Sequence, residues 1–503
     1  MKTPASHVSI LRTRTTIILA VMLFLASAYF YQDPEWNGNS RLDLTRALVE
    51  QGKFQIDDFV AQPGWTTEDR ALFEGHFYSD KAIGSSLLAA PFYFLLLKVS
   101  AAAGAMAGSA FVKHILTTIV QGSAFTAAGV AMFLIAAEIT EDPARALVSA
   151  LAVSLGTMLW PYSAVYYGHV LAAAFLILAF YLLFRGRQAS DPHTLRRYFF
   201  AGLSLGLAFI TEYTSALIIA GLIVYALYVL VGHKAWAVVR AGFAGAVGAS
   251  LPLSLAIFYN WSIYGSPLAT GYAYEAENRF QAGMSLGFMG LHLPSLANAY
   301  HITLDPQFGL FWQSPVLLLA LIGFFFALRG PRHRAEGLVC LYSIAVMIAM
   351  NGGYYLWWGG SAFGPRLLIP ALPFFIVPLA ALPAAATWSV GALGALSCGQ
   401  MLIPLLGQIQ TTRLAYRLQQ GAFYVADEKF TGFSLLYGYG VPQILRQYRE
   451  GSAAWTLGSA LGLPFWLSAP ALMLAEAGLA LKLLQSDPTR RLRRQPAPRA
   501  DAG

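Results

Sequence analysis

The sequence predicts an all-α, polytopic integral membrane protein, and three observations support this fold class. Hydrophobic residues make up 57% of the 503 residues, charged residues only 12%, and the mean hydropathy is +0.55. Apolar runs of about 20 residues, the length of a helical membrane span, recur along the chain. Strict apolar–polar alternation is missing from these runs, and backbone groups in hydrocarbon must bond internally, so helices rather than a barrel are expected.

The first apolar run covers residues 15–31 and follows Lys2, Arg12 and Arg14. Cations before a first span place the N-terminus in the cytoplasm. Ala26-Ser27-Ala28 has the composition of a signal-peptidase site. We nevertheless expect an uncleaved span, because the run is long enough to cross a bilayer and no soluble domain follows it.

Twelve further candidate spans bring the expected number of transmembrane helices to about 13. They lie near residues 83–99, 113–137, 143–161, 164–184, 198–213, 215–231, 241–260, 309–328, 337–353, 366–384, 389–408 and 461–483. We expect one transmembrane domain over residues 1–484 and a basic, disordered cytoplasmic tail over 485–503.

Basic residues sort the loops into two groups. Arginine-rich segments at 185–197, 233–240 and 329–334, together with the tail, read as cytoplasmic. By parity the external segments are 32–82, 261–308, 354–365 and 409–460. An odd number of spans conflicts with two cytoplasmic tails, and the Gly/Ala-rich stretch 100–110 is a candidate re-entrant or broken helix.

The first external segment concentrates acids. It holds five cations and ten carboxylates: Asp33, Glu35, Asp43, Glu50, Asp57, Asp58, Glu68, Asp69, Glu74 and Asp80. Connecting two helices needs only a few residues, so this length and charge indicate a function. The apolar spacing after Ser40 predicts a short amphipathic helix on the membrane surface, capped by Ser40 and ending at Gly52. Asp43 and Arg46 share one face of it.

Charge and cysteines exclude other classes. The net charge of +8 arises from cytoplasmic loops and the tail, so anionic membrane lipids rather than nucleic acid are the expected partners. Cys340 and Cys398 each stand alone in an apolar segment, so neither a disulfide framework nor a thiolate metal site is expected.

Two motifs in the first external segment resemble those of C-type membrane glycosyltransferases, in the branch of protein O-mannosyltransferases and aminoarabinose transferases. Asp43-Leu44-Thr45-Arg46 is similar to the family's acidic-x-x-Arg helix, and Tyr78-Ser79-Asp80-Lys81 to its Tyr-x-x-Lys element without the prolines. Asn37-Gly38 stands where the family has an Asp-Glu pair, which leaves the catalytic base open.

Later motifs, in order along residues 15–384, resemble those of bacterial lipid-carrier-dependent glycosyltransferases. They are Pro161-Tyr162-Ser163, Gly168-His169, Thr211-Glu212-Tyr213, Tyr259-Asn260-Trp261, Gly265-Ser266-Pro267, Gly309-Leu310-Phe311, Ser314-Pro315, Trp357-Trp358-Gly359-Gly360 and Phe363-Gly364-Pro365-Arg366.

The resemblance implies transfer of a sugar from a polyprenyl-phosphate-linked donor to a lipid, glycan or protein acceptor at the external face of a bacterial inner membrane. This chemistry needs a carboxylate to accept the acceptor's proton and cations to hold the departing phosphate. The candidates for the base are Asp43 first, then Asp33, Glu35 and Asp80. The candidates for donor and phosphate binding are Lys81, Arg41, Tyr78, His169 and Arg366. A divalent cation is left open, because no acid pair has metal-ligand spacing.

Structural explanations compete with these roles. Asp43 and Arg46 also fit a solvated ion pair, and Arg366 fits an interfacial arginine. A secondary transporter is the main rival class, although the sequence lacks the internal repeat that such folds show. A lipid-sugar polymerase or ligase, with its key loop at 409–460, and a non-catalytic scaffold remain alternatives.

Overall fold

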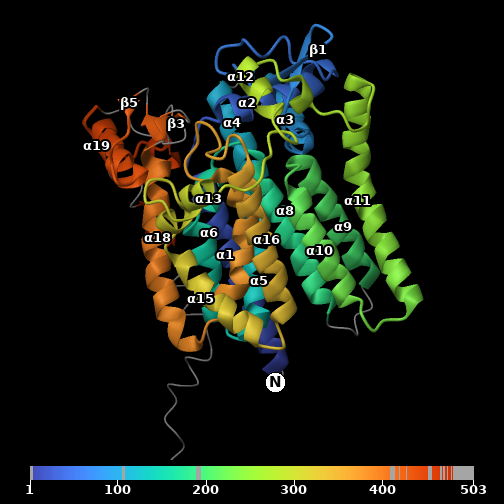
Figure 1. The fold of residues 1–503 in the computed structure, drawn as a ribbon. Coiled ribbons are helices and arrows are strands. Elements are labelled where there is room, and N and C mark those ends of the chain that lie inside the picture. Colours follow the sequence, from blue (N-terminus) through green and yellow to red (C-terminus); the bar gives the residue numbers. More distant parts are fainter. Residues whose placement is uncertain are drawn as a thin grey trace, which may run out of the picture.

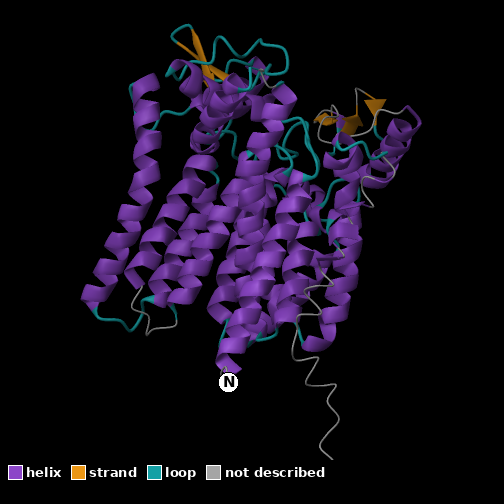
Figure 2. Ribbon diagram, turned by 180° about the vertical axis from the view of Figure 1, so that it is seen from behind, coloured by secondary structure: helices purple, strands orange, loops and turns teal. Residues whose placement is uncertain are grey.

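Helices dominate a computed structural model of the chain, which confirms the predicted fold class (Figure 1). The structure describes residues 4–104, 108–187, 194–407, 414–417, 420–425, 428–450, 456–464, 467, 471–472, 474–476 and 478–479. The helices lie side by side in one bundle, with the N-terminus at one end and the short strands at the other (Figures 1 and 2).

Eleven helices of the described ranges form this bundle. They are α1 (Pro4–Ala28), α5 (Ser123–Thr140), α6 (Pro143–Leu155), α8 (Gly168–Gly186), α9 (Thr194–Thr211), α10 (Ser215–Val229), α11 (Ala235–Tyr264), α15 (Val316–Arg329), α16 (Arg334–Gly353), α17 (Ile376–Ala381), which continues the 3₁₀ helix η4 (Arg366–Phe375), and α18 (Thr387–Gly407). By length and composition, six helices among the described residues can cross a membrane, and five shorter apolar helices accompany them. The chain is a multi-pass membrane protein.

The predicted span at 83–99 explains the conflict in parity. It forms α3 (Gly84–Ala102), which begins against Ile210 and Thr211 at the strand-bearing end of the bundle. The next helix, α4 (Ser109–Thr117), starts in contact with Gly64 of the first external segment, at the same end. The chain therefore enters and leaves α3 on one side, and the count of about 13 spans is not confirmed.

Without α3, the helices alternate in direction and would bring both tails to one side once the last predicted span is added. That span, 461–483, is described only in part, and the tail 485–503 lies outside the described residues entirely. Composition could not reveal that α3 stays on one side, because an apolar helix at the end of a bundle has the same hydropathy as a membrane span.

The first external segment folds onto the bundle through a helix, a π-helical turn and a hairpin. These elements are α2 (Glu35–Arg46), η1 (Ala47–Gln51), β1 (Arg70–Phe73) and β2 (His76–Ser79). The hairpin pairs Arg70 with Ser79 and turns through Glu74 and Gly75, both with positive φ, as in a two-residue type I′ loop.

The predicted helix is present, but its start and its environment differ from the prediction. It begins at Glu35 behind Pro34, and Ser40 lies inside it rather than at its cap. It continues through η1, and the helical segment ends at Gly52, as predicted, where the backbone is left-handed with φ +66°. The eight residues 38–45 are all buried, so α2 lies between the loop and the bundle and not on a membrane surface.

The other external elements meet the first segment at the same end. They are η3 (Gly271–Tyr274), α12 (Asn278–Met284), α13 (Leu296–Thr303), β3 (Leu414–Arg417), β4 (Ala422–Val425), β5 (Glu428–Lys429), the π-helical turn η8 (Leu436–Gly440) and α19 (Val441–Glu450). A bridge between Ala71 and Glu275 joins the second external segment to the hairpin. A small apolar core beneath the loop, which includes Leu44, Ile56 and Tyr259, holds both against α11.

Two glycines bring α9 and α11 into backbone contact. A Cβ at Gly202 would lie 1.9 Å from the carbonyl oxygen of Gly245, and one at Gly248 would lie 2.0 Å from that of Phe199. Small residues at such crossings let membrane helices approach closely. This packing fixes the end of α9, where Glu212 follows.

Candidate active site

Lys81 lies in a nearly closed pocket of carboxylates directly after the hairpin. Its ammonium group is 3.0 Å from Asp69 Oδ2 and pairs with the adjacent Asp80. The side chains are 10% exposed for Lys81, 13% for Asp69 and 1% for Asp80. The hairpin register places residue 69 opposite residue 80, so strand pairing itself brings the acids together.

Two serines hold the Asp80 side of this cluster. Ser40 Oγ of α2 donates to Asp80 Oδ1 at 3.1 Å and lies 2.8 Å from Ser79 Oγ. Burial raises the pKa of Asp80, while Lys81 opposes that rise. Burial also acts against the charged form of Lys81, but Asp69 and Asp80 outweigh it and hold its pKa well above the usual value. The two carboxylates therefore favour the charged form of Lys81 in this pocket.

A second cation, Arg41 of α2, lies beside this cluster. Its Nη2 is 2.8 Å from Glu212 Oε1, and its Nη1 donates to the carbonyl oxygen of Ala82 at 3.3 Å. His169, at the start of α8, approaches the same Glu212 oxygen with Nδ1 at 3.5 Å. His169 Nε2 is buried and has no hydrogen-bond partner among the described residues. The arrangement leaves one imidazole nitrogen open for a ligand.

Arg366 provides a third cation, partly buried, from the start of η4. Its Nε donates to the carbonyl oxygen of Gly359 at 2.7 Å, and its guanidinium lies 4.9 Å from the centre of the Tyr167 ring. Gly359 has a φ of +78°, so the turn before η4 needs a glycine to present this carbonyl. Nη1 of Arg366 is buried without a hydrogen-bond partner in the described part of the chain.

These groups form one site, because they act on the same two side chains. Arg366, Arg41 and Lys81 all lie close enough to His169 to act on it electrostatically. Lys81 and Arg366 act on the Tyr167 hydroxyl in the same way. Residues from the first segment, from α8 and from η4 thus converge at the strand-bearing end of the bundle.

Glu35 faces the Arg366 side of the site from the first turn of α2. Burial raises the pKa of Glu35 to about 7, Asp33 adds to the rise and Arg366 opposes it. Asp33 accepts a hydrogen bond from the Glu35 backbone N–H at 3.0 Å and is itself nearly half exposed. Lys113 Nζ lies 3.4 Å from Asp33 Oδ2. Glu35 is thus a carboxyl group poised to exchange a proton near neutral pH.

Asp43 lies among different charges. Burial raises the pKa of Asp43 to about 8, with Arg46 and Lys113 opposing the rise and Glu50 adding to it. Both carboxyl oxygens are buried without hydrogen-bond partners among the described residues. Arg46 pairs with Glu50 at 2.9 Å, and Asp43 is fully buried, so Asp43 and Arg46 do not form the solvated ion pair that was the structural alternative.

Tyr78 also points away from the cations. Successive side chains of a strand face opposite sides, and Ser79 faces Ser40. Tyr78 instead packs in the small core beneath the loop, with its ring 6.2 Å from that of Tyr264. Of the residues singled out from sequence, Lys81, Asp80, Arg41, His169, Arg366 and Glu35 come together, Asp33 lies at the edge, and Asp43 and Tyr78 lie elsewhere.

The sequence reading did not single out Asp69, Tyr272 or Glu275 for the site. Tyr272 and Glu275 come from the second external segment; the Tyr272 ring centre is 5.8 Å from Lys81 Nζ. Burial, and then Asp80, raise the pKa of Glu275 to about 10. Asp69 had a usable signal, because a Glu-Gly turn at 74–75 implies a register that sets residue 69 against residue 80. The other two had none.

In the described residues, no group of three or more His, Cys, Asp and Glu side chains could hold a metal ion. What the site offers instead is a set of buried and partly buried cations with unfilled hydrogen-bonding positions, beside carboxylates that can hold a proton.

The solved structures that are similar to the chain include two crystal structures of ArnT from Cupriavidus metallidurans, an aminoarabinose transferase. The one bound to undecaprenyl phosphate is 12% identical in sequence and has a TM-score of 0.47. The one in the apo state is 13% identical and has a TM-score of 0.48. Each comparison covers 96% of this chain and 76% of the other.

No family model and no curated protein sequence matches the chain.

Proposed function

We propose that the protein is a glycosyltransferase that moves a sugar from a polyprenyl-phosphate-linked donor to an acceptor hydroxyl or amine. The proposal places the reaction at the end of the bundle that holds Lys81 and Arg366. The opposite end carries the N-terminus and the arginine-rich loops, so the reaction lies at the external face of the membrane. The membrane in this proposal is a bacterial inner membrane.

The observation that carries the proposal is that Nη1 of Arg366 and Nε2 of His169 are both buried without hydrogen-bond partners among the described residues, while Arg366 and Lys81 both act electrostatically on His169. A buried donor without a partner costs about 1–3 kcal/mol, and more when it is charged. A phosphate group supplies several strong acceptor oxygens and the negative charge that guanidinium and ammonium groups bind best. A phosphate ester at this position would satisfy the donors.

The same cations serve the chemical step. As the bond between the anomeric carbon and the phosphate oxygen breaks, the electron pair passes to the phosphate, and Arg366 and Lys81 stabilise its growing charge. The acceptor oxygen or nitrogen forms the new bond to the anomeric carbon from the opposite side, which inverts the configuration. Its proton passes to a carboxylate.

Glu35 is the base that the geometry favours. It lies on the Arg366 side of the site, and its pKa of about 7 suits proton transfer near neutral pH. Asp69 is the second choice, because its contact with Lys81 at 3.0 Å commits it to that ion pair. Asp43 stays a prediction from the sequence. The charges that act on it are those of Arg46, Lys113 and Glu50, and among them Lys113 also contacts Asp33 at the edge of the site.

The experiment is sugar transfer by the purified protein in lipid nanodiscs, with a panel of radiolabelled polyprenyl-phosphate sugars. We expect transfer or donor hydrolysis by the native protein and its loss in Arg366→Ala and Lys81→Ala. Lys53→Ala is the matched control, because Lys53 lies in the same external segment and is exposed.

Two results would contradict the proposal. One is equal turnover by the native protein and both site variants, which would remove the site. The other is no turnover with the whole donor panel together with substrate-dependent transport in liposomes, which would make the protein a transporter. Turnover only with a second lipid-linked sugar as acceptor would assign the reaction to the polymerase or ligase class.

A further inference from the structure

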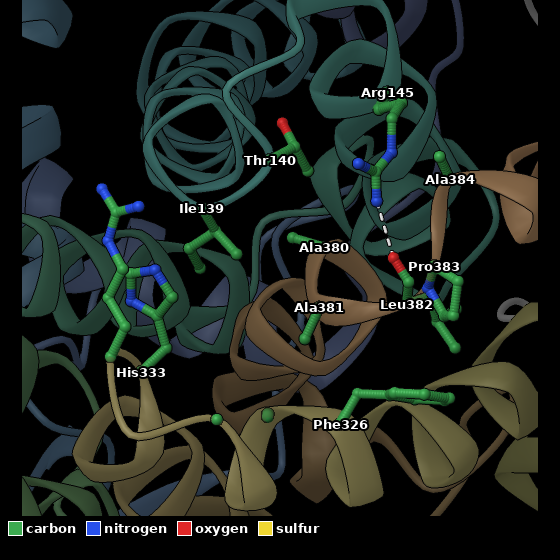
Figure 3. Close-up of a pocket in the computed structure, with 13 residues that line it drawn as sticks. Ile139, Thr140, Arg145, Phe326, His333, Ala380, Ala381, Leu382, Pro383 and Ala384 are labelled. Atoms are coloured by element: carbon green, nitrogen blue, oxygen red, sulfur yellow. Dashed lines mark hydrogen bonds between the residues drawn. The ribbon is translucent and has the colours of Figure 1, made fainter.

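A cavity of about 300 Å³ lies at the end of the bundle opposite Lys81. It is enclosed by the end of α5, the start of α6, the connection from α15 to α16 and the end of α17 (Figure 3). The position follows from α5, which begins beside Ser27 near the end of α1 and runs back toward the N-terminal end of the bundle at Thr140. The cavity therefore opens on the side of the arginine-rich loops.

The cavity has an apolar floor and a basic rim. Ile139, Phe326 and Ala381 face its middle, as Figure 3 shows. Its lining includes Arg145, Arg332 and His333, and Figure 3 shows Arg145 and His333 on opposite sides of the cavity. A volume of this size with a few polar groups over apolar walls is typical of a small-molecule or headgroup site.

The cations of the rim are not neutralised by the carboxylates nearby. Arg145 donates to the carbonyl oxygen of Leu382 at 2.6 Å and makes no ion pair with the described residues. Arg332 pairs with Glu141 at 2.7 Å, but both side chains are about two-thirds exposed, and such pairs contribute little.

His333 adds two open nitrogens. Both ring nitrogens are buried and lack hydrogen-bond partners among the residues described. The nearest carboxylate is that of Glu336, whose Oε2 lies 4.0 Å from His333 Nδ1, beyond hydrogen-bond distance. Its Oε1 binds Arg187 at 2.6 Å and the Tyr225 hydroxyl at 2.5 Å, so the charge of Glu336 is balanced by Arg187 and not by Arg145 or Arg332.

We propose that this cavity binds a phosphate ester, with the phosphate held by Arg145, Arg332 and His333 and the organic part resting on Ile139 and Phe326. Guanidinium groups bind phosphate oxygens through charge-assisted hydrogen bonds. Basic pockets between helices on the cytoplasmic side of membrane proteins bind the headgroups of anionic lipids. The ligand is thus an anionic phospholipid headgroup of the adjoining leaflet or a free phosphate of the same chemistry.

Occupancy of the cavity would also fasten the bundle. Arg145 of α6 already binds the chain just after α17, which ends the segment that starts at Arg366. A phosphate shared by Arg145 and Arg332 would tie α6, α17 and the start of α16 together. Because a ligand that binds only the folded state stabilises it, we expect saturating ligand to raise the unfolding temperature.

The experiment measures binding of three soluble probes to the full-length protein in a neutral detergent by isothermal titration calorimetry. The probes are short-chain phosphatidylglycerol, short-chain phosphatidylcholine and inorganic phosphate. We expect the native protein to bind phosphatidylglycerol at least about tenfold more tightly than phosphatidylcholine, and Arg145→Gln to lose about that factor. Arg240→Gln, an exposed arginine of α11 outside the cavity, should bind like the native protein.

Two further variants keep the test informative if Arg145→Gln does not fold. Arg332→Gln changes an exposed side chain and should weaken phosphatidylglycerol several-fold, and Ala381→Phe fills the cavity without changing its charge and should abolish binding. Phosphatidylglycerol binding that inorganic phosphate fails to displace assigns the site to a lipid. Tight phosphate binding that phosphatidylglycerol does not improve assigns it to the free anion. Equal binding of both lipids, or unchanged binding in Arg332→Gln and Ala381→Phe, would overturn the proposal.

Discussion

Arg41 and Glu212 are 171 positions apart in the sequence and form a buried ion pair, with 2.8 Å between Nη2 and Oε1. Arg41 is 1% exposed and Glu212 10%. Through Nη1, Arg41 also donates to Ser85 Oγ at 3.1 Å, just after the turn that follows Lys81. The pair therefore fastens the first external segment to the end of α9 and fixes where Lys81 lies.

We expect removal of either partner to destabilise the protein strongly. Arg41→Gln or Glu212→Gln leaves an uncompensated buried charge, which costs about 3–5 kcal/mol. The double variant Arg41→Met with Glu212→Leu removes both charges and should recover most of the loss. Thermal unfolding in detergent measures both effects. Single variants as stable as the native protein would show that the pair is solvated and not structural.

The local features of the site were predictable and the long-range ones were not. Lys81 and Arg366 stand at loop-to-helix boundaries, where a cation is visible in the sequence, and the structure brings them to one end of the bundle. Arg41 stood within the predicted helix, but its partner Glu212 follows another helix far along the chain. Such a pairing depends on the packing of α9, and no periodicity in one segment encodes it.

The errors have physical causes of the same kind. Serine is a common N-cap residue, so Ser40 was expected to begin the helix. The helix instead starts at Glu35, directly after Pro34, and Ser40 lies inside it as a buried donor to Asp80. The span predicted at 83–99 is an apolar helix. Two contacts show that it stays at one end of the bundle: its first residue lies against Thr211, and Ser109, at the start of the next helix, lies against Gly64.

A substitution at Gly271 should impair transfer without unfolding the protein. A Cβ at this position would lie 2.6 Å from the Cα of Asp80, so Gly271→Val pushes the second external segment away from the Lys81 cluster. A displacement of about 1 Å at a reacting centre can cost on the order of 100-fold in rate. The assay is sugar transfer alongside thermal unfolding, with Gly242→Val of α11, which has open space, as the control. Unchanged transfer would mean that this contact does not shape the site.

The pH dependence of transfer tests Glu35 as the base. The carboxylate must be unprotonated to accept a proton, so with a pKa of about 7 the rate should rise between about pH 6 and pH 8 and then level off. Glu35→Gln should lower the rate by about 100-fold or more. Asp33→Asn removes a charge that raises the pKa of Glu35, so it should move the rising limb to lower pH. Loss of transfer in Asp69→Asn with a normal Glu35→Gln enzyme would reassign the base.

Asp43 should affect stability more than catalysis. Its pKa is about 8 in the folded protein and about 3.9 in an unfolded chain, so the folded state holds a proton that the unfolded state releases between these values. Stability from this group is therefore complete below about pH 4 and is lost as the pH rises to about 8. The isosteric Asp43→Asn has no charge to bury, and we expect it to be more stable than the native protein by about 5 kcal/mol at pH 9, with little difference at pH 4.

Thermal unfolding of both proteins from pH 4 to pH 9 measures this difference, with exposed Asp58→Asn as the control. The transfer assay on the same preparations separates the two roles of Asp43. An Asp43→Asn protein that is stabilised at high pH and still transfers sugar leaves Glu35 as the base. A variant that loses transfer while its stability follows the native curve would return that role to Asp43, and would mean that its carboxyl group is ionised in the folded protein.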